Sequence, residues 1–363
     1  MQLIITFIGV AFFAMVIAWG SIPFIIKWAH RTGQLTQLNN RTSHKVPTPA
    51  LGGIGILLGM FVLIPFLDIS LPIAATCLSA IILFTTGLID DLNEINAKIK
   101  LVVQTLSALL IYFSGLQIEN LHGLFGIFEI SELWGFIITI LFVVGVTNSF
   151  NLMDGINGLA GSLTVVNSAV FALIFYFNGQ FNFALIAFAM LGSVLGFLRY
   201  NMRNAKIFMG DTGSLFLGLL MSVFVIKAFQ SPINTELSIS LALVPMFIPI
   251  FDTLRLITTR IMEGKSPLKA DKNHLHHLVV NATRSHSQAT FVIIVFHITL
   301  LGFVTFEMYS GGELLLNTLI GLLIFGVMVF LSFFIVVEMY RNLKRFRSHL
   351  KLLTGDNSLL KKL

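Results

Sequence analysis

Long apolar runs recur along almost the whole of this 363-residue chain, and they constrain its fold more than any other feature. A helix of about twenty apolar residues crosses a bilayer core, where every backbone polar group must be satisfied within the protein. Hydrophobic residues make up 56% of the chain and charged residues only 11%, whereas a soluble domain is about a quarter charged. The sequence therefore predicts an all-α integral membrane protein, built as a single polytopic domain over residues 1–363.

We expect about eleven transmembrane helices, which leaves no room for a sizeable soluble domain. The predicted spans cover residues 3–26, 51–67, 71–89, 99–115, 134–150, 158–177, 181–198, 213–229, 238–258, 290–309 and 313–340. The single cysteine, Cys77, lies inside one of these runs, so no intrachain disulfide can form.

Basic residues predict how the helices are oriented. When loops are numbered from an external N-terminus, only Lys227 of the 23 Lys and Arg residues falls on the external side. Cytoplasmic loops carry the excess of Lys and Arg, so we expect the N-terminus outside and the C-terminus inside. The first basic residue is Lys27, which favours a retained first helix over a cleaved signal peptide. The pI near 9.5 then fits a basic face against anionic membrane lipid rather than a nucleic-acid partner.

One polar segment interrupts the apolar pattern. It reads Asn148-Ser-Phe-Asn151-Leu-Met-Asp154-Gly155-Ile-Asn157-Gly158-Leu-Ala-Gly161. Within a membrane, such residues are kept where protein or a water-filled cavity shelters them, and they usually serve function. The amides donate and accept hydrogen bonds, and the Asp154 carboxylate can bind a metal or take a proton. The plainer interpretation is a short polar loop between two helices.

A pair of adjacent carboxylates, Asp90 and Asp91, ends the third predicted span, with Lys98 and Lys100 close behind. Adjacent carboxylates repel unless a cation intervenes, and Mg²⁺ prefers one or two carboxylates together with phosphates and water. The pair therefore suits a magnesium site, or one member suits a general base. A solvated helix end would explain the same pair, but the pair falls on the same face as the segment 148–161.

The loop after residue 198 combines basic residues with a glycine turn, and it includes Asn201 and Phe208 before Gly210-Asp211-Thr-Gly213-Ser214. An aspartate between glycines at a helix start can present a metal ligand beside amides that bind phosphate. Phe208 is expected either to stack on a base or to anchor the loop.

The longest predicted cytoplasmic loop carries His274, His276 and His277 among lysines. Three histidines suggest zinc or a phosphate clamp. Zinc normally takes a fourth ligand and no cysteine is near, so phosphate fits this basic loop better.

Two smaller features have competing interpretations. Lys45 precedes the Pro47-Thr-Pro49 break and Gly52-Gly53, and it either binds phosphate or is an ordinary basic flank. Asp252 and Arg255 lie three residues apart, so we expect a pair on one helix face, with a substrate contact as the second interpretation.

Together these features suit magnesium-dependent chemistry on a phosphorylated substrate at the membrane surface. The motifs Asp90-Asp91, Asn148-x-x-Asn151-x-x-Asp154-Gly, Phe208-Met-Gly-Asp211-x-Gly-Ser and His274-x-His276-His277 resemble those of the polyprenyl-phosphate N-acetylhexosamine-1-phosphate transferases, glycosyltransferase family 4. The resemblance covers nearly the whole chain and includes the Pro47–Gly53 segment.

The resemblance implies a reaction in the bacterial inner membrane. A UDP-N-acetylhexosamine and undecaprenyl phosphate would give the lipid diphosphosugar and UMP, the first membrane step of a cell-envelope polysaccharide such as lipopolysaccharide or teichoic acid. It also implies Mg²⁺ as the cofactor, with Mn²⁺ as an alternative, and it implies that the active-site loops are cytoplasmic. A homodimer is compatible with it.

The resemblance further implies residue roles. Asp211 would ligate the metal, and Asp90 and Asp91 would serve the lipid phosphate, one of them as base. Asn151, Asp154 and Asn201 would shape the nucleotide and metal site, Phe208 would stack on uracil, and the three histidines His274, His276 and His277 would grip the diphosphate. We therefore expect Asp154 to be catalytic along with Asp90 and Asp91. We also expect further substrate contacts from Lys45, Lys98, Lys100, Asn148 and Asn157.

Two branches of the family compete. The peptidoglycan branch, phospho-N-acetylmuramoyl-pentapeptide transferase, usually has three consecutive histidines followed by Phe-Glu. The His274-Leu-His276-His277 loop here resembles the branch that uses UDP-GlcNAc or a related small sugar. Asn157 stands where a second Asp is common and Glu94 where a third is frequent, which leaves their roles open.

A transporter is the rival class, but transporter sites lie near the bilayer midplane, and these carboxylates gather at span ends.

Overall fold

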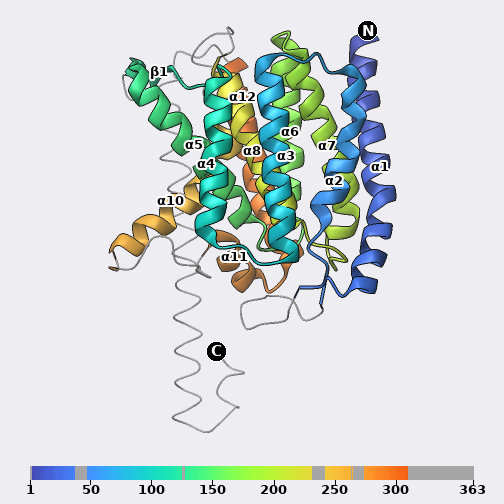
Figure 1. Ribbon diagram of the computed structural model, residues 1–363. Helices are drawn as coiled ribbons and strands as arrows, with labels where there is room; N and C mark the ends of the chain where they lie inside the picture. The colour runs from blue at the N-terminus through green and yellow to red at the C-terminus, as the bar shows by residue number, and fades with distance from the viewer. Residues whose placement is uncertain are drawn as a thin grey trace.

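The computed structural model describes residues 2–36, 47–124, 127–230, 242–262, 264 and 274–309. These residues form a bundle of helices with one small hairpin (Figure 1). The elements are α1 Gln2–Thr32, α2 Gly52–Met60, η1 Phe61–Phe66, α3 Leu71–Leu92, α4 Ala97–Phe113, β1 Asn120–Leu124, β2 Ile127–Glu129, α5 Glu132–Met153, α6 Leu159–Phe177, α7 Phe181–Asn201, α8 Gly210–Phe229, η2 Val244–Met246, α10 Phe247–Met262, α11 Leu275–Thr283 and α12 His286–Tyr309.

The described residues contain seven helices that are long and apolar enough to cross a membrane, namely α1, α3, α5, α6, α7, α8 and α12 up to Phe306. The integral, mainly helical architecture predicted from the apolar runs is thus confirmed, whereas the count of eleven spans stays a prediction. The predicted span 99–115 corresponds to α4, and the described part of 238–258 corresponds to η2 and α10; these helices are not among the seven. The predicted span 51–67 is helical but divided, because α2 gives way to the 3-10 turn η1, which contains Pro65. The predicted span 313–340 lies outside the described residues.

Helix α8 is the centre of the bundle. Nearly all of its residues are buried, and it packs against α3, α5, α2 and α6. A helix that is apolar on every side is stable only where other helices surround it, which is the position of α8. The polar first turn of α8 therefore lies among the ends of the helices that pack around it.

Close helix approach builds the other side of the bundle, where α1 packs on α7 and α2. A Cβ atom added at Gly59 would overlap the Ala14 carbonyl oxygen and the Ser193 hydroxyl, and one at Gly192 would overlap the backbone of Ala11. Glycine is needed at both positions because the helix backbones nearly touch, as is usual between membrane helices.

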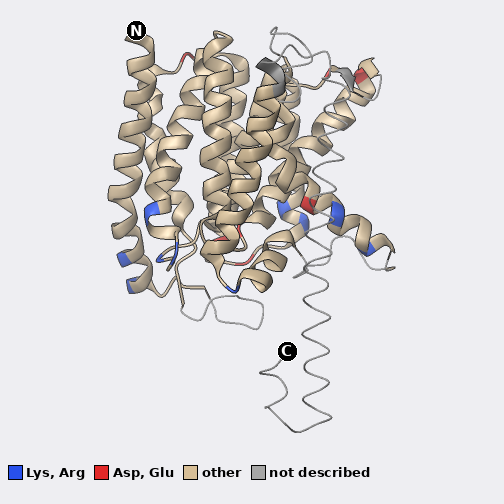
Figure 2. Ribbon diagram, turned by 180° about the vertical axis from the view of Figure 1, so that it is seen from behind, with Lys and Arg blue, Asp and Glu red and all other residues tan. Residues whose placement is uncertain are grey.

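The polar helix ends lie at one end of the bundle. The C-terminal ends of α3, α5 and α7, the N-terminal ends of α4 and α8, and helix α11 are all at the lower end in Figure 1, and the β-hairpin is at the upper end. In Figure 2, the Lys and Arg residues lie mostly in the lower half. This separation agrees with the alternation of basic loops read from the sequence.

The hairpin was not predicted. The predicted spans 99–115 and 134–150 leave residues 116–133 as a connecting loop, but within it β1 and β2 pair antiparallel, with Asn120 opposite Glu129. The strands have five and three residues, too few for a recognisable alternating pattern.

Candidate active site

The site is built first by the end of α3 against the start of α8. Asp91 accepts hydrogen bonds from the backbone N–H groups of Asp211 and Thr212, each at 2.9 Å, and from the Thr212 hydroxyl. The first N–H groups of a helix have no partner within the helix, so an external carboxylate satisfies them and favours the positive end of the helix dipole. A Cβ atom at Gly87 would overlap the backbone of Asp211, so glycine lets α3 come this close.

A lysine joins two of the carboxylates. Lys100 Nζ lies 2.9 Å from Asp90 Oδ2 and 2.8 Å from Asp211 Oδ2. The other oxygen of Asp90 accepts the backbone N–H of Ile95 at 2.8 Å. The three side chains are only 16–24% exposed, so water weakens these charge-assisted bonds less than on an open surface.

The polar segment of α5 reaches the same point. Asn151 Nδ2 lies 2.8 Å from both Asp211 Oδ1 and the Ser214 hydroxyl. Asp154 follows at the C-terminal end of α5. Burial, with the charges of Asp91 and Asp211 adding to it against an opposing hydrogen bond from Gly210, raises the pKa of Asp154 well above its usual value. Four carboxylates, from the end of α3, the end of α5 and the start of α8, therefore lie close together, and Lys100 pairs with two of them.

This cluster fits a divalent cation. Asp90, Asp91 and Asp211 can each offer one carboxylate oxygen within 4.8 Å of the others, and they are the only such group among the residues that the structure describes. An all-oxygen donor set suits hard cations such as Mg²⁺ or Mn²⁺. The ammonium group of Lys100 already lies between two of these carboxylates, so the site favours positive charge.

Two asparagines hold the loops beside the cluster. Asn201 accepts the N–H of Gly158 at 2.8 Å and donates to the Ile207 carbonyl at 2.9 Å. Asn157 donates to the Arg203 carbonyl at 2.7 Å. Both side chains are buried, and they join the turn after α5 to the loop before α8. The hydrogen bonds described for both side chains go to backbone groups, and Oδ1 of Asn157 is buried without a hydrogen-bond partner among the described residues.

The backbone around Phe208 is paired with the segment after Pro47. Phe208 donates to the Pro49 carbonyl at 2.8 Å, and Gly52 donates to the Phe208 carbonyl at 2.9 Å. The proline–glycine segment singled out in the sequence therefore anchors the loop that leads into α8. Phe208 is half-buried, and Lys45 lies outside the described residues.

The histidine motif lies at the start of α11. His274 Nδ1 is 2.9 Å from Asp252 Oδ2, and the His276 ring packs so closely on Gly155 that a Cβ atom there would overlap it. Burial, together with the charge of His277, lowers the pKa of His276 to about 3, so this ring is neutral at neutral pH. The motif thus contacts the polar segment of α5, and no histidine belongs to a metal-binding group within the described residues.

Two residues expected to bind substrate have no described contact with the carboxylate cluster, namely Lys98 and Asn148. Lys98 is exposed and its side chain makes no described contact with the cluster. Asn148 exchanges hydrogen bonds with Gln104 of α4, at 2.7 and 3.2 Å, and so ties α5 to α4. Gln104 was not singled out because a lone glutamine in an apolar run has no distinctive spacing.

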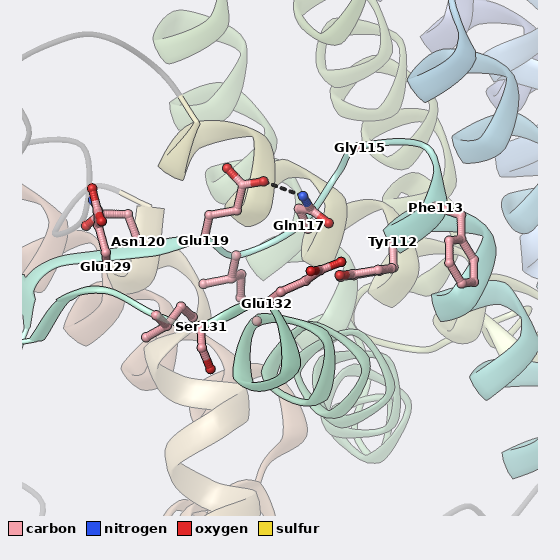
Figure 3. A pocket seen from close by; sticks show the side chains of 12 residues that line it. Tyr112, Phe113, Gly115, Gln117, Glu119, Asn120, Glu129, Ser131 and Glu132 are labelled. Atoms are coloured by element: carbon pink, nitrogen blue, oxygen red, sulfur yellow. Dashed lines mark hydrogen bonds between the residues drawn. The ribbon is translucent and has the colours of Figure 1, made fainter.

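The opposite end of the molecule carries a separate cavity of about 680 Å³ (Figure 3). It is lined by α4, the hairpin and α5, and the lining includes Tyr112, Glu119, Glu129 and Glu132. None of the residues in the four motifs lines it, so the cluster around Lys100 is the candidate active site.

Comparison with known proteins places this site in a class. The sequence profile of glycosyl transferase family 4 matches residues 73–229, the part of the chain that carries Asp90, Asp91, Asn151, Asp154 and Asp211. The chain belongs to this family, as the extent of its similarity to individual members also shows.

Three relatives show how far the similarity extends. The chain is 33% identical over 287 residues to the "Probable undecaprenyl-phosphate N-acetylglucosaminyl 1-phosphate transferase" of Bacillus subtilis, covering 78% of each chain. It is 31% identical over 285 residues to the "Undecaprenyl-phosphate alpha-N-acetylglucosaminyl 1-phosphate transferase" of Escherichia coli, covering 77% of each chain. It is 30% identical over 288 residues to the protein of the same name in Yersinia pestis, covering 77% of this chain and 78% of the relative.

Proposed function

We propose that this protein transfers N-acetylglucosamine-1-phosphate from UDP-GlcNAc to undecaprenyl phosphate and releases UMP. One observation carries the proposal: Asp90, Asp91, Asp211, Lys100 and Asn151, from four separate helices, meet at one end of the bundle. The names of the relatives support the same substrates.

The reaction is a displacement at phosphorus. An oxygen of the lipid phosphate attacks the phosphorus that bears the sugar, a new P–O bond forms, and the P–O bond to UMP breaks with its electron pair leaving on UMP. Phosphoryl transfer depends on positioning and charge neutralisation more than on covalent help from the protein. A site of charged and amide groups at a helix bundle end supplies both.

The geometry distinguishes the two adjacent aspartates. Both oxygens of Asp91 are occupied by donors at the start of α8, which supports a positioning role. Oδ2 of Asp90 pairs with Lys100 and is not used to hold the start of α8, so we propose that Asp90 accepts the proton of the lipid phosphate. Lys100 supplies positive charge for the phosphates.

Mg²⁺, or Mn²⁺ in its place, would be held by Asp211, with the negative charges of Asp90 and Asp91 close by. When bound, such a cation neutralises the charge that develops on the diphosphate. Asn151 would orient Asp211 through its 2.8 Å hydrogen bond. Phe208 would stack on uracil, and the three histidines would bind phosphate oxygens.

We also propose that the site faces the cytoplasm, with the N-terminus outside. The Lys and Arg residues at the same end of the bundle support this orientation (Figure 2). A water-soluble UDP-sugar and a membrane-embedded lipid phosphate then meet where the helices end.

The test is an assay of UMP release by the purified protein with undecaprenyl phosphate, Mg²⁺ and a panel of UDP-sugars. We expect release with UDP-GlcNAc or a close analogue and none with the UDP-N-acetylmuramoyl-pentapeptide. Release with the muramoyl nucleotide alone would move the protein to the peptidoglycan branch.

A further inference from the structure

Asp252 is a buried carboxylate that the reaction scheme does not use. It lies on α10, only 1% of it is exposed, and its oxygens reach across to the start of α11. Oδ2 is 2.9 Å from His274 Nδ1, and Oδ1 accepts the backbone N–H of Leu275 and the guanidinium of Arg255, each at 2.9 Å. The pair with Arg255 expected from the sequence is present, but two of the three bonds go to the histidine motif.

These bonds fix both the helix start and the ring. The side chain of His274 does not cap α11 itself, so Asp252 provides the acceptor for the first N–H of that helix. An ionised carboxylate only accepts hydrogen bonds, so Nδ1 of His274 carries the proton and Nε2 is the nitrogen left for another partner. Asp252 thereby sets the tautomer and the orientation of this ring.

The effect extends to the next histidine. The rings of His274 and His276 stack with centroids 5.5 Å apart and an interplanar angle of 11°. His276 is 1% exposed, and neither of its ring nitrogens has a hydrogen-bond partner among the residues that the structure describes. A buried polar ring without partners is costly, so its location against Gly155 must be imposed by the surrounding structure. The anchored start of α11 is what imposes it.

We propose that Asp252 is the positioning residue of the histidine motif: it holds α11 and the His274 ring so that His276 is presented to the Gly155 turn beside the carboxylate cluster. Asp252 touches no substrate in this scheme. The inference rests on the proposed function for its kinetic part, since the histidines are assigned to substrate phosphate, but the anchoring itself does not depend on the reaction.

Chemical modification tests the anchoring without any assay of activity. Diethyl pyrocarbonate reacts with accessible histidines, and mass spectrometry gives the rate at each residue. We expect slow modification of His276 in the unaltered protein and in Arg255→Gln, which removes the other side-chain partner of the same carboxylate. In Asp252→Ala and Asp252→Asn the rate at His276 should rise by about tenfold or more, since a factor of ten corresponds to only about 1.4 kcal/mol of lost protection. Exposed His30 serves as the internal reference.

Kinetics test the consequence for substrate. Asp252→Ala should raise KM for UDP-GlcNAc by about tenfold or more and leave KM for undecaprenyl phosphate within about threefold, because the histidines are assigned to the nucleotide diphosphate. The double variant His274→Ala with Asp252→Ala should have nearly the same KM for UDP-GlcNAc as Asp252→Ala alone, since the effects of residues that act as a unit do not add. Both KM values of Arg255→Gln should stay close to those of the unaltered protein.

The outcomes separate the two proposals. If Asp252→Ala and Asp252→Asn keep His276 protected, or if Arg255→Gln reproduces both effects, Asp252 is a structural helix partner and the inference is wrong. The same conclusion follows if the Asp252 variants have a lower melting temperature but an unchanged modification rate at His276. If His276 becomes reactive while the unaltered protein transfers no GlcNAc-1-phosphate, the anchoring stands and the proposed function fails.

Discussion

Asp211 is the residue on which most of the site converges. Its carboxylate is bonded to Lys100 and Asn151, and its backbone N–H to Asp91. Asp211→Asn preserves the shape of the side chain but replaces an anionic oxygen with an amide, a poor ligand for a hard cation. We expect turnover to fall by about a hundredfold or more, the usual size of such an electrostatic loss.

The matched control for Asp211→Asn is Glu129→Gln, an exposed carboxylate in β2 at the far end of the bundle. Turnover at several Mg²⁺ and Mn²⁺ concentrations, and after chelation with EDTA, measures the effect. Near-normal turnover of Asp211→Asn with an unchanged metal requirement would show that Asp211 does not bind the metal.

Asp90 and Asp91 are adjacent in sequence but should differ in their variants. Asp91→Asn places an N–H donor against the N–H groups at the start of α8, and losing hydrogen bonds to a charged group costs about 1–3 kcal/mol. We expect a lower melting temperature for Asp91→Asn. Asp90→Asn should lower turnover with a smaller change in melting temperature, because an amide oxygen can still accept the N–H of Ile95 and the other oxygen of Asp90 pairs with Lys100 at the site. Equal melting temperatures and equal turnover for the two variants would contradict the assignment.

At the scale of single residues, the sequence predicted which residues belong to the site better than it predicted their hydrogen-bond partners. Asp90, Asp91, Asn151, Asp154 and Asp211 were recognisable because charged and amide groups interrupt apolar runs. The bonds between them join residues as far apart as 120 positions, as between Asp91 and Asp211, and no local spacing encodes such a contact. The link from Asp252 to His274 was missed for the same reason.

Helices α3 and α8 define the geometry of the site through their close approach. Gly87→Ala would insert a methyl group against the backbone of Asp211, and overpacking of this kind costs about 1–3 kcal/mol. We expect lower turnover and a lower melting temperature. Gly145→Ala in α5 is the matched control, since an added Cβ atom there meets nothing within 4 Å. Equal effects of the two substitutions would mean that the approach of α3 to α8 does not set the site.

The elements themselves were largely predictable because a bilayer admits few structures. Apolar length alone located α3, α5, α6, α7 and α8 close to their observed bounds, while α1 continues to Thr32, past the predicted end at residue 26. The division of 51–67 into α2 and η1 and the short hairpin were not predicted, because both depend on local turns and on packing against neighbours. Membrane orientation remained a prediction from charge.

The orientation of the whole molecule can be measured with single cysteines in a Cys77→Ser background. Glu94→Cys lies beside the site, and Glu129→Cys lies in the hairpin at the other end; both positions are exposed. In intact cells, a membrane-impermeant thiol reagent should label position 129 and leave position 94 unlabelled until the membrane is opened. Labelling of both positions from outside would rule out the proposed topology.

The central claim is that the sugar is transferred together with its phosphate. The most direct measurement uses UDP-GlcNAc labelled with ³²P only at the phosphate that bears the sugar, incubated with the purified protein, undecaprenyl phosphate and Mg²⁺. We predict that the label appears in the lipid product and that the released nucleotide is unlabelled UMP, with Asp211→Asn giving neither. Label recovered in released UDP, with an unlabelled lipid-linked sugar, would contradict the proposed transfer.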